Sequence, residues 1–382
     1  MIPYGKQQIS QQDIDAVVDI LRSDYLTQGP KVPEFEQALC AYTGAKYALA
    51  VNSATSALHL ACRALDISVG DIVWTSPITF VASANCVLYC GAQVDFVDID
   101  PRSFNICPNK LKNKLEQAAL NNCLPKALII VHMCGQPCDI KAIHRLSLQY
   151  KFKIIEDASH AIGARYLNQP IGRCEFSDIT VFSFHPVKII TTGEGGATLT
   201  NSDTLAQKIA LLRSHGVTRD PNKMTQEPDG PWFYQQLDLG FNYRMTELQG
   251  ALGLSQLQRI DQWVTRRNEL ANHYDKLLMP LAVTAPKQHP DGISARHLYV
   301  IQLQQPEQRL SVYLAMQAAR IGVNIHYIPV HTQPYYQALG HQLGDYPNAE
   351  KYYQAALSLP LFPALTNQQQ DFIVATLAKA LT

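Results

Sequence analysis

The sequence lacks the features that would place it in several special classes of protein. No apolar run approaches the ~18 residues that are needed to cross a bilayer, so a membrane protein is not expected. Lys plus Arg and Asp plus Glu number 32 each, and this zero net charge argues against a general binder of nucleic acid or acidic membranes. The sequence contains no internal repeat, low-complexity tract or charge run. The first residues, 1–6, lack the basic and apolar regions of a signal peptide, so we expect a cytoplasmic protein.

The cysteines do not form the framework of a secreted protein. The nine cysteines are odd in number and scattered over 382 residues, which is typical of reduced intracellular thiols. His132, Cys134, Cys138 and His144 lie close together in the sequence and raise the possibility of a zinc site. A CxxxC pair without a second pair is a weak zinc signal, however. Small buried thiols near a strand end are the simpler interpretation, and no metal is expected.

The first part of the chain alternates between strand and helix patterns. A capping box of the Ser10 to Asp13 type begins one helix, and a second helix spans 33–42 and ends at Gly44. Strands are predicted at 47–51, 71–75, 93–98, 127–131, 153–156 and 179–184, with helices at 54–65, 80–89 and 140–150. This order predicts a mostly parallel sheet with helices on both faces, and ligands then bind at the carboxyl ends of the strands.

The pattern changes near residue 250, with no linker to mark a boundary. One long helix is expected over 251–269, then a strand over 297–303 and a helix over 310–321. A short strand-like run at 323–327 and a last helix at 368–381 follow. We therefore predict a large domain over 1–250, which includes an N-terminal arm of residues 1–30, and a smaller α+β domain over 251–382.

Two segments carry residues suited to Schiff-base chemistry. Lys188 follows a predicted strand and stands beside Ile189, Ile190 and several glycines, so its amine should be desolvated and nucleophilic. On its own, a lysine in a tight turn is the simpler reading. Asp157 ends an apolar strand, where a carboxylate could keep a pyridine nitrogen protonated, although a helix N-cap is the commoner role of such a residue. The two segments together favour the catalytic interpretation.

Two further segments fit a cofactor that has a phosphate group and a flat ring. Residues 52–58 join a strand to a helix and are rich in hydroxyls, so free N–H groups there could bind a phosphate, with Ser183 as another donor. Simple helix capping explains the same pattern. Phe80 stands at a strand-to-helix turn and could stack on a flat ring, although burial in the core is the usual fate of such a side chain.

In this order, these segments resemble the sugar aminotransferases of the DegT/DnrJ/EryC1/StrS family. The similarity extends over essentially the whole chain and includes residues 26–30, 212–216, 240–245 and 326–331. It implies the aspartate-aminotransferase-like fold, with a mostly parallel seven-stranded sheet and a small C-terminal domain. It also implies pyridoxal 5'-phosphate (PLP) as cofactor. Some relatives carry histidine in place of the lysine and are sugar 3-dehydratases, so Lys188 favours transamination.

The resemblance also implies roles for individual residues. Lys188 would bind PLP covalently, Asp157 would pair with its ring nitrogen, and His160 would lie by its 3-hydroxyl. Phe80 would stack on the ring. The phosphate would be held by Ala54, Thr55 and Ser183, joined by Asn242 of the partner subunit in a homodimer whose active site is shared across the interface. The nucleotide-sugar side would be formed by Tyr4, Leu26, Thr27, Gln28, Gly29, His326 and Tyr327.

The motifs are most similar to those of transaminases of pseudaminic acid biosynthesis. The implied reaction moves an amino group from L-glutamate to the C4 ketone of UDP-2-acetamido-2,6-dideoxy-β-L-arabino-hex-4-ulose. Three alternatives stay open: another 3- or 4-keto sugar nucleotide, a non-catalytic protein that binds PLP or a sugar nucleotide, and a zinc protein using Cys134 and Cys138. Arg213, Arg219 and Arg244 are all candidates for holding the glutamate carboxylates.

Overall fold

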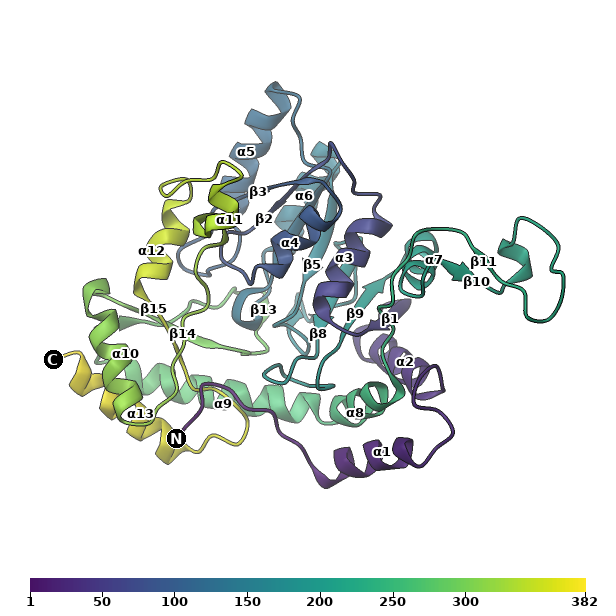
Figure 1. The fold of residues 1–382 in the computed structure, drawn as a ribbon. Coiled ribbons are helices and arrows are strands. Elements are labelled where there is room, and N and C mark those ends of the chain that lie inside the picture. Colours follow the sequence, from purple (N-terminus) through teal and green to yellow (C-terminus); the bar gives the residue numbers. More distant parts are fainter.

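The computed structural model describes residues 1–382 and is built around a seven-stranded sheet (Figure 1). The strand order is β1-β9-β8-β5-β4-β2-β3, and every pairing among β8, β5, β4, β2 and β3 is parallel. Only β9 runs antiparallel to both of its neighbours. The predicted mostly parallel sheet is therefore confirmed. Its strands are β1 (Tyr47–Val51), β2 (Ile72–Thr75), β3 (Gln93–Phe96), β4 (Ala127–Val131), β5 (Lys153–Asp157), β8 (Ile179–Ser183) and β9 (Gly196–Thr200).

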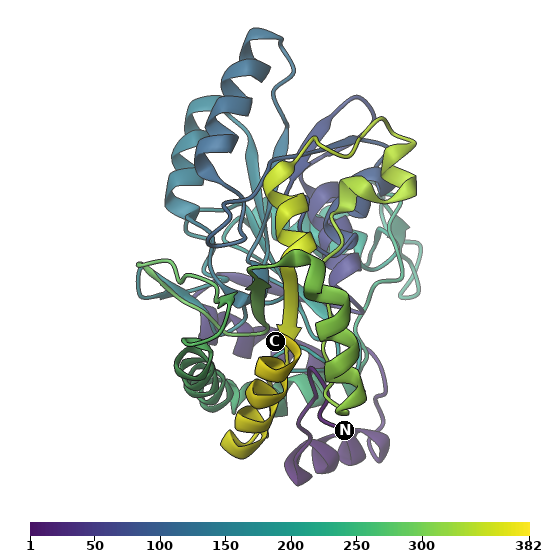
Figure 2. The ribbon, with the colours of Figure 1, turned by 90° about the vertical axis from the view of Figure 1, so that its left-hand side faces the viewer.

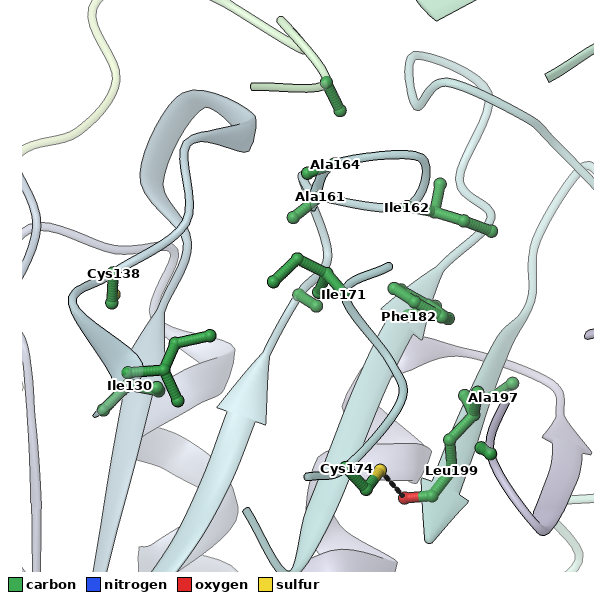
Figure 3. Close-up of a cluster of buried hydrophobic side chains, with 14 of the residues drawn as sticks. Ile130, Cys138, Ala161, Ile162, Ala164, Ile171, Cys174, Phe182, Ala197 and Leu199 are labelled. Carbon is green, nitrogen blue, oxygen red and sulfur yellow. Dashed lines mark hydrogen bonds between the residues drawn. The ribbon is translucent and has the colours of Figure 1, made fainter. Parts of the chain in front are cut away.

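Both faces of this sheet are buried. In β4 all five residues are buried, and Leu128 and Ile130 join one hydrophobic cluster while Ala127 and Ile129 join the other. This alternation follows from the two-residue period of a strand, and strands buried on both faces read as continuous apolar runs. Figure 3 shows part of the first cluster, where Cys174 donates to the Leu199 carbonyl at 3.3 Å.

Helices cover the two faces of the sheet (Figures 1 and 2). The cluster that contains Ala127 is completed by α3, α4 and α7, and the opposite cluster by α2, α5, α6 and the neighbouring parts of α8 and α9. No helix in the structure is both long and apolar enough to span a membrane. The helices of this part are α1 (Gln11–Leu21), α2 (Lys31–Thr43), α3 (Ala54–Ala64), α4 (Ala82–Tyr89), α5 (Pro108–Leu120), α6 (Ile140–Tyr150), α7 (Asp203–Leu212), α8 (Glu247–Leu257) and α9 (Ile260–Leu278).

The prediction of one continuous helix over 251–269 is wrong. The chain forms α8 and α9 instead, and they are interrupted at Arg259, whose φ of −110° and ψ of 5° are not helical. The Arg259 guanidinium is drawn to the buried Asp13 carboxylate of α1. The capping box predicted at Ser10 and Asp13 is present, and Asp13 also accepts from Ser255 at 2.6 Å. One buried carboxylate therefore ties α1 to the junction of α8 and α9.

The last part of the chain forms a smaller layer of its own. A three-stranded antiparallel sheet, in the order β12-β14-β15, packs against α9, α10 and α13 through a separate hydrophobic cluster. The run at 323–327 does not form a strand and contributes only one bridge, from Asn324 to Ser358. The division of the chain at residue 250 stays a prediction. The elements here are β12 (Val283–Thr284), β14 (Tyr299–Leu303), β15 (Ala356–Leu359), α10 (Arg309–Ala318), α11 (Pro334–Gln337), α12 (Pro347–Ala355) and α13 (Asn367–Ala380).

Two short β elements complete the fold. A small sheet joins β13 (Gly292–Ile293), β6 (Arg165–Tyr166) and β7 (Gln169–Pro170). The strands β10 (Val217–Thr218) and β11 (Gln235–Gln236) pair at the base of an arm that projects from the body of the molecule (Figure 1). The N-terminal residues run the other way, toward the C-terminal layer, where Ile2 forms a bridge with Ile321.

Candidate active site

A cavity of about 560 Å³ lies at the carboxyl ends of the parallel strands. Loops after β1, β2, β5 and β8 line it, together with the N-terminal segment and residues 324–327. This is where ligands bind in open α/β sheets, because loops and helix N-termini gather at that edge. The cavity brings together many of the residues singled out from the sequence, namely Tyr4, Ala54, Thr55, Phe80, Asp157, His160, Ser183, Lys188, His326 and Tyr327.

Lys188 lies in the loop that connects β8 to β9. The ends of this loop are held together, since Ser183 and Gly196 are paired residues of the two strands. The loop folds back on itself, and the Thr192 N–H donates to the Phe184 carbonyl at 3.0 Å. Burial among protein atoms lowers the pKa of Lys188 to about 8, and the nearby Asp157 charge only partly offsets this effect. Roughly a tenth of the lysine is therefore a free amine at pH 7, far more than for an exposed lysine.

Asp157 is the last residue of β5 and is almost fully buried. Its Oδ2 accepts a hydrogen bond from Ser83 Oγ at 2.6 Å, and its Oδ1 accepts from the Ser159 N–H at 3.1 Å. Both oxygens thus keep a lone pair for a further donor. The carboxylate lies beside Lys188, which makes a negative charge available inside the cavity.

The N-terminus of α3 offers free backbone donors to the cavity. Ser53 caps the helix by accepting from the Ser56 N–H at 3.1 Å, which leaves the N–H groups of Ala54 and Thr55 without protein partners. The helix dipole adds a partial positive charge at this end. Gly196 passes so closely that a Cβ there would stand 2.6 Å from the Ala54 nitrogen. The arrangement suits a phosphate group.

Aromatic side chains form one wall of the cavity. Phe80 is not a core residue, as its type alone would suggest; its side chain is 59% exposed and its ring lies 6.2 Å from that of Tyr327. His160 Nε2 is 3.2 Å from the Tyr327 hydroxyl, while His160 Nδ1 is buried without a partner. Burial, with Lys188 and His326 nearby, holds the pKa of His160 well below its usual value, so the ring is neutral.

Not every predicted site residue reaches this cavity. Leu26, Thr27, Gln28 and Gly29 lie against the start of α8, where Thr27 forms a bridge with Thr246. Asn242 lies next to the segment that joins β1 to α3, where its backbone oxygen accepts from Asn52 Nδ2 at 3.3 Å. None of these five residues lines the cavity.

The arginine candidates also lie outside the cavity, whose lining contains no arginine. Arg213 is paired with Glu36 and donates to the Ala50 carbonyl at 2.8 Å, so it is engaged inside the protein. Arg244 donates to Ser214 Oγ at 3.1 Å. Arg219 is exposed on the projecting arm and has no charged partner. Of the three, Arg219 is therefore the most available to a ligand.

The histidine and cysteine group near residue 134 forms contacts with the protein itself. His132 Nε2 is 2.8 Å from Glu156 Oε2, and its Nδ1 accepts from the Cys138 N–H at 3.0 Å. Cys138 packs in the hydrophobic cluster near Ile130 (Figure 3), and burial raises the pKa of its thiol. His144 faces the Phe176 carbonyl at 3.1 Å. The set does not converge on one point.

Several residues of the site were not predicted from the sequence. Ser83 and Thr79 form a buried chain of hydroxyls behind Asp157, and His297 packs against His160 with ring centroids 4.4 Å apart. Asn324 also lines the cavity. Ser83 lies in the hydroxyl-rich segment around Phe80, which was the only available signal. His297 could not be found, because its contact joins segments 137 residues apart (297 minus 160).

The residues present fit PLP. A desolvated lysine can bind an aldehyde, a buried carboxylate can face a pyridine nitrogen, and two free N–H groups can take a phosphate. The orphaned Nδ1 of His160 offers one more polar contact to the ring. The fold and the site together define a PLP-dependent enzyme of the aspartate-aminotransferase type.

Comparison with known proteins narrows this class. Residues 7–378 match the DegT/DnrJ/EryC1/StrS aminotransferase family, and the chain belongs to it. The chain is 39% identical over 387 residues to the UDP-4-amino-4,6-dideoxy-N-acetyl-beta-L-altrosamine transaminase of Campylobacter jejuni, covering 100% of this chain and 98% of that protein. It is 38% identical to the spore coat polysaccharide biosynthesis protein SpsC of Bacillus subtilis, with 98% of this chain and 95% of that one covered. The protein is therefore a PLP-dependent sugar aminotransferase.

Solved structures agree with this assignment. The PMP form of Spr1654 from Streptococcus pneumoniae superposes with a TM-score of 0.92 at 29% identity, over 100% of this chain and 99% of that one. Helicobacter pylori PseC, an aminotransferase involved in the biosynthesis of pseudoaminic acid, superposes with a TM-score of 0.90 at 32% identity and the same coverage.

Proposed function

We propose that this enzyme transfers the amino group of L-glutamate to the C4 ketone of UDP-2-acetamido-2,6-dideoxy-β-L-arabino-hex-4-ulose. The product would be UDP-4-amino-4,6-dideoxy-N-acetyl-β-L-altrosamine. The main support is the 39% identity, over the full chain, to a transaminase named for that amino sugar. The cavity with Lys188 and Asp157 at one edge of the sheet supports the chemistry.

In this proposal the cofactor is held by residues from four loops. Lys188 would bind PLP covalently, and Asp157 would face its ring nitrogen. The N–H groups of Ala54 and Thr55, with Ser183, would hold the phosphate. Bound PLP supplies an electron sink and a temporary carrier for the amino group. Phe80 and His160 would contact the ring from the aromatic wall.

Lys188 would also move the proton of the reaction. Its pKa of about 8 leaves a useful fraction of free amine at neutral pH, which a general base requires. Its flanking residues Ile189 and Ile190 are buried, so water is excluded from one side of the loop. The same amine would accept a proton from Cα of the amino donor in the first half-reaction and would donate a proton to the sugar carbon in the second.

The nucleotide sugar would enter on the side of Tyr4, His326 and Tyr327. His326 is neutral, because burial, with Lys188 nearby, lowers its pKa to about 4. Its Nδ1 is 2.7 Å from Ser358 Oγ, which fixes the ring, and the Tyr4 ring centroid is 5.4 Å away. Neutral, fixed donors of this kind suit sugar hydroxyls. Residues 26–29 would reach the sugar of a second copy.

A homodimer would complete the site. The arm that contains Arg219 carries exposed apolar side chains, among them Trp232 at 70% exposure and Leu239 at 74%. A single chain leaves such surface facing water, and a second copy would cover it. In that arrangement Asn242 and Arg219 would be the partner's contributions to the phosphate and to the glutamate carboxylate, since the cavity has no arginine of its own.

The keto sugar is the part of the proposal with a specific rival. SpsC, at 38% identity, is named for spore coat polysaccharide biosynthesis, so a keto-sugar nucleotide that leads to another polysaccharide is the rival substrate. A panel of 3-keto and 4-keto sugar nucleotides, assayed with L-glutamate, separates the two. Turnover that is fastest with the proposed UDP sugar supports the proposal, and a clear preference for another keto sugar contradicts it.

The absorption spectrum tests the chemistry before any sugar is needed. The purified protein should show a band near ~420 nm from the lysine-bound cofactor, and L-glutamate should replace it with one near ~330 nm. The Lys188→Ala variant is the control. It should lack the band of the lysine-bound cofactor, and L-glutamate should not cause the spectral change seen in wild type. A colourless protein that does not take up PLP would contradict the proposed roles.

A further inference from the structure

A buried chain of two hydroxyls leads to the Asp157 carboxylate. Ser83, in the first turn of α4, is 1% exposed, and its Oγ donates to Asp157 Oδ2 at 2.6 Å. Thr79 Oγ1 lies 2.7 Å from the same Ser83 oxygen and is also buried. An ionised carboxylate can only accept, so Ser83 must give its single proton to Asp157. Ser83 then accepts from Thr79, and the direction of the whole chain is fixed.

The hydroxyl groups of Ser83 and Thr79 bond toward the Asp157 carboxylate and not to the backbone of α4. The N-cap of α4 is Val81, which has no capping side chain, and neither hydroxyl bonds to a backbone group. Ser and Thr near a helix start usually bond to the local backbone, so this departure needs another explanation. The only end point of the chain is Asp157.

Ser83 restricts the orientation of that carboxylate. The second oxygen, Oδ1, is held by the Ser159 N–H at 3.1 Å, so each oxygen has one donor and the carboxylate plane is fixed. The terminal torsion of an aspartate is otherwise broad. Without the Ser83 hydroxyl, Oδ2 would lose its protein partner in a buried place, and the carboxylate could turn away from the cavity.

We propose that Ser83 is a positioning residue for Asp157, with Thr79 as its support. The inference rests on the proposed role of Asp157 toward the ring nitrogen of PLP. A charge-assisted bond of that kind needs both distance and direction, and a second layer of hydrogen bonds supplies them. Ser83 would therefore affect the cofactor's electronic state without touching the cofactor.

The test compares Ser83→Ala with Ser76→Ala in the holoenzyme. Ser76 is a second fully buried serine of the same segment and has no contact with Asp157, so it controls for the loss of a buried hydroxyl. Loss of a hydrogen bond to a charged group lowers an equilibrium or rate constant by a factor of about 10 to 100. Ser83→Ala should slow the glutamate half-reaction by about that factor and weaken PLP binding. It should also shift the pH midpoint of the visible band, and Ser76→Ala should do none of these.

Two more variants separate positioning from folding. Thr79→Val keeps the shape of the side chain and removes only the outer hydroxyl, so its loss should be smaller than that of Ser83→Ala. Ser83→Thr keeps the hydroxyl and should show the same visible band and pH midpoint as wild type. A Ser83→Ala enzyme with an unchanged midpoint and a half-reaction within about twofold of wild type would overturn the inference.

A double-variant cycle decides whether Ser83 acts through Asp157. In an Asp157→Asn background, Ser83→Ala should change PLP affinity little further, since the group that it positions is already altered. Full additivity of the two effects would overturn the inference. A wild-type protein that binds no PLP would instead contradict the proposed function, so the two failures are distinguishable.

Discussion

Replacing Asp13 by alanine should destabilise the protein by about 3 kcal/mol. The Asp13 side chain is fully buried and accepts from the Ser10 backbone at 2.8 Å, from Ser255 and from Gln256 at 2.7 Å, and it pairs with Arg259. Removal of one partner of a buried ion pair costs about 3–5 kcal/mol. The Arg259 side chain is 18% exposed and also donates to Gln12, so its charge would still be partly solvated without Asp13. The lower end of this energy range therefore applies.

Urea denaturation at fixed protein and PLP concentrations measures this loss. Asp15, exposed on the same helix, offers the matched control, because Asp15→Ala removes only a contact with Gln11. Trp263 lies 5.3 Å from the Arg259 guanidinium, so its fluorescence reports on the junction. A loss below about 1 kcal/mol for Asp13→Ala would refute the reasoning, since that is the range of exposed pairs.

The difference in stability between wild type and Asp13→Ala should depend on pH through the pKa of Asp13. Burial alone would raise this pKa, but the hydrogen bonds from Ser10, Ser255 and Arg259 hold it below its usual value. A carboxyl whose folded pKa is lowered stabilises the fold above its unfolded pKa of about 3.9, and this contribution is lost as the pH falls through the folded value. The difference between wild type and Asp13→Ala should therefore stay constant from about pH 5 to 8 and narrow only below about pH 4.

Four other outcomes are expected. Lys188→Ala should lower turnover by more than the ~10²–10⁴-fold typical of losing one general base, because the covalent role is lost as well; a rate above a small fraction of wild type in a coupled assay would contradict this. PLP uptake by the cofactor-free enzyme, followed by absorbance, should quicken as the pH rises through about 8, the pKa of Lys188. Trp232→Ser should weaken a dimer measured by sedimentation, whereas an unchanged dissociation constant would remove the arm from the interface. Gly196→Ala should weaken PLP binding in dialysis, since the new Cβ would meet the backbone nitrogen of Ala54 at 2.6 Å.

Local patterns were sufficient to predict most of the large sheet. Continuous apolar runs such as 127–131 marked buried strands because both faces are covered. The start of α8 was also encoded locally, as a capping box from Thr246 to Gln249, but it was missed in favour of the apolar pattern that follows. The ion pair of Arg259, at the break, with Asp13 has no local signal, because the two residues are 246 positions apart in the sequence.

Some residues of the candidate site could likewise be predicted from local sequence, and others could not. Lys188 and Asp157 each carried a local signal, an amine in an apolar loop and a carboxylate at a strand end, and the structure places both in one cavity. The state of Phe80 could not be read from its residue type, since an aromatic at a turn can face the core or a cavity. The link from Ser83 to Asp157 needs the order of the strands, because β4 lies between the strands that carry these two segments.

The hairpin geometry of the lysine loop has a consequence for redesign. Residues 184–195 leave the sheet at Ser183 and return to it at the paired Gly196, so the whole loop hangs from two fixed neighbouring points. Exchange of this segment would leave the strand order unchanged, but a replacement must keep apolar residues at positions 189 and 190, because both side chains lie in the hydrophobic core. Loops that carry a different residue in place of Lys188 could then be compared in one unchanged frame.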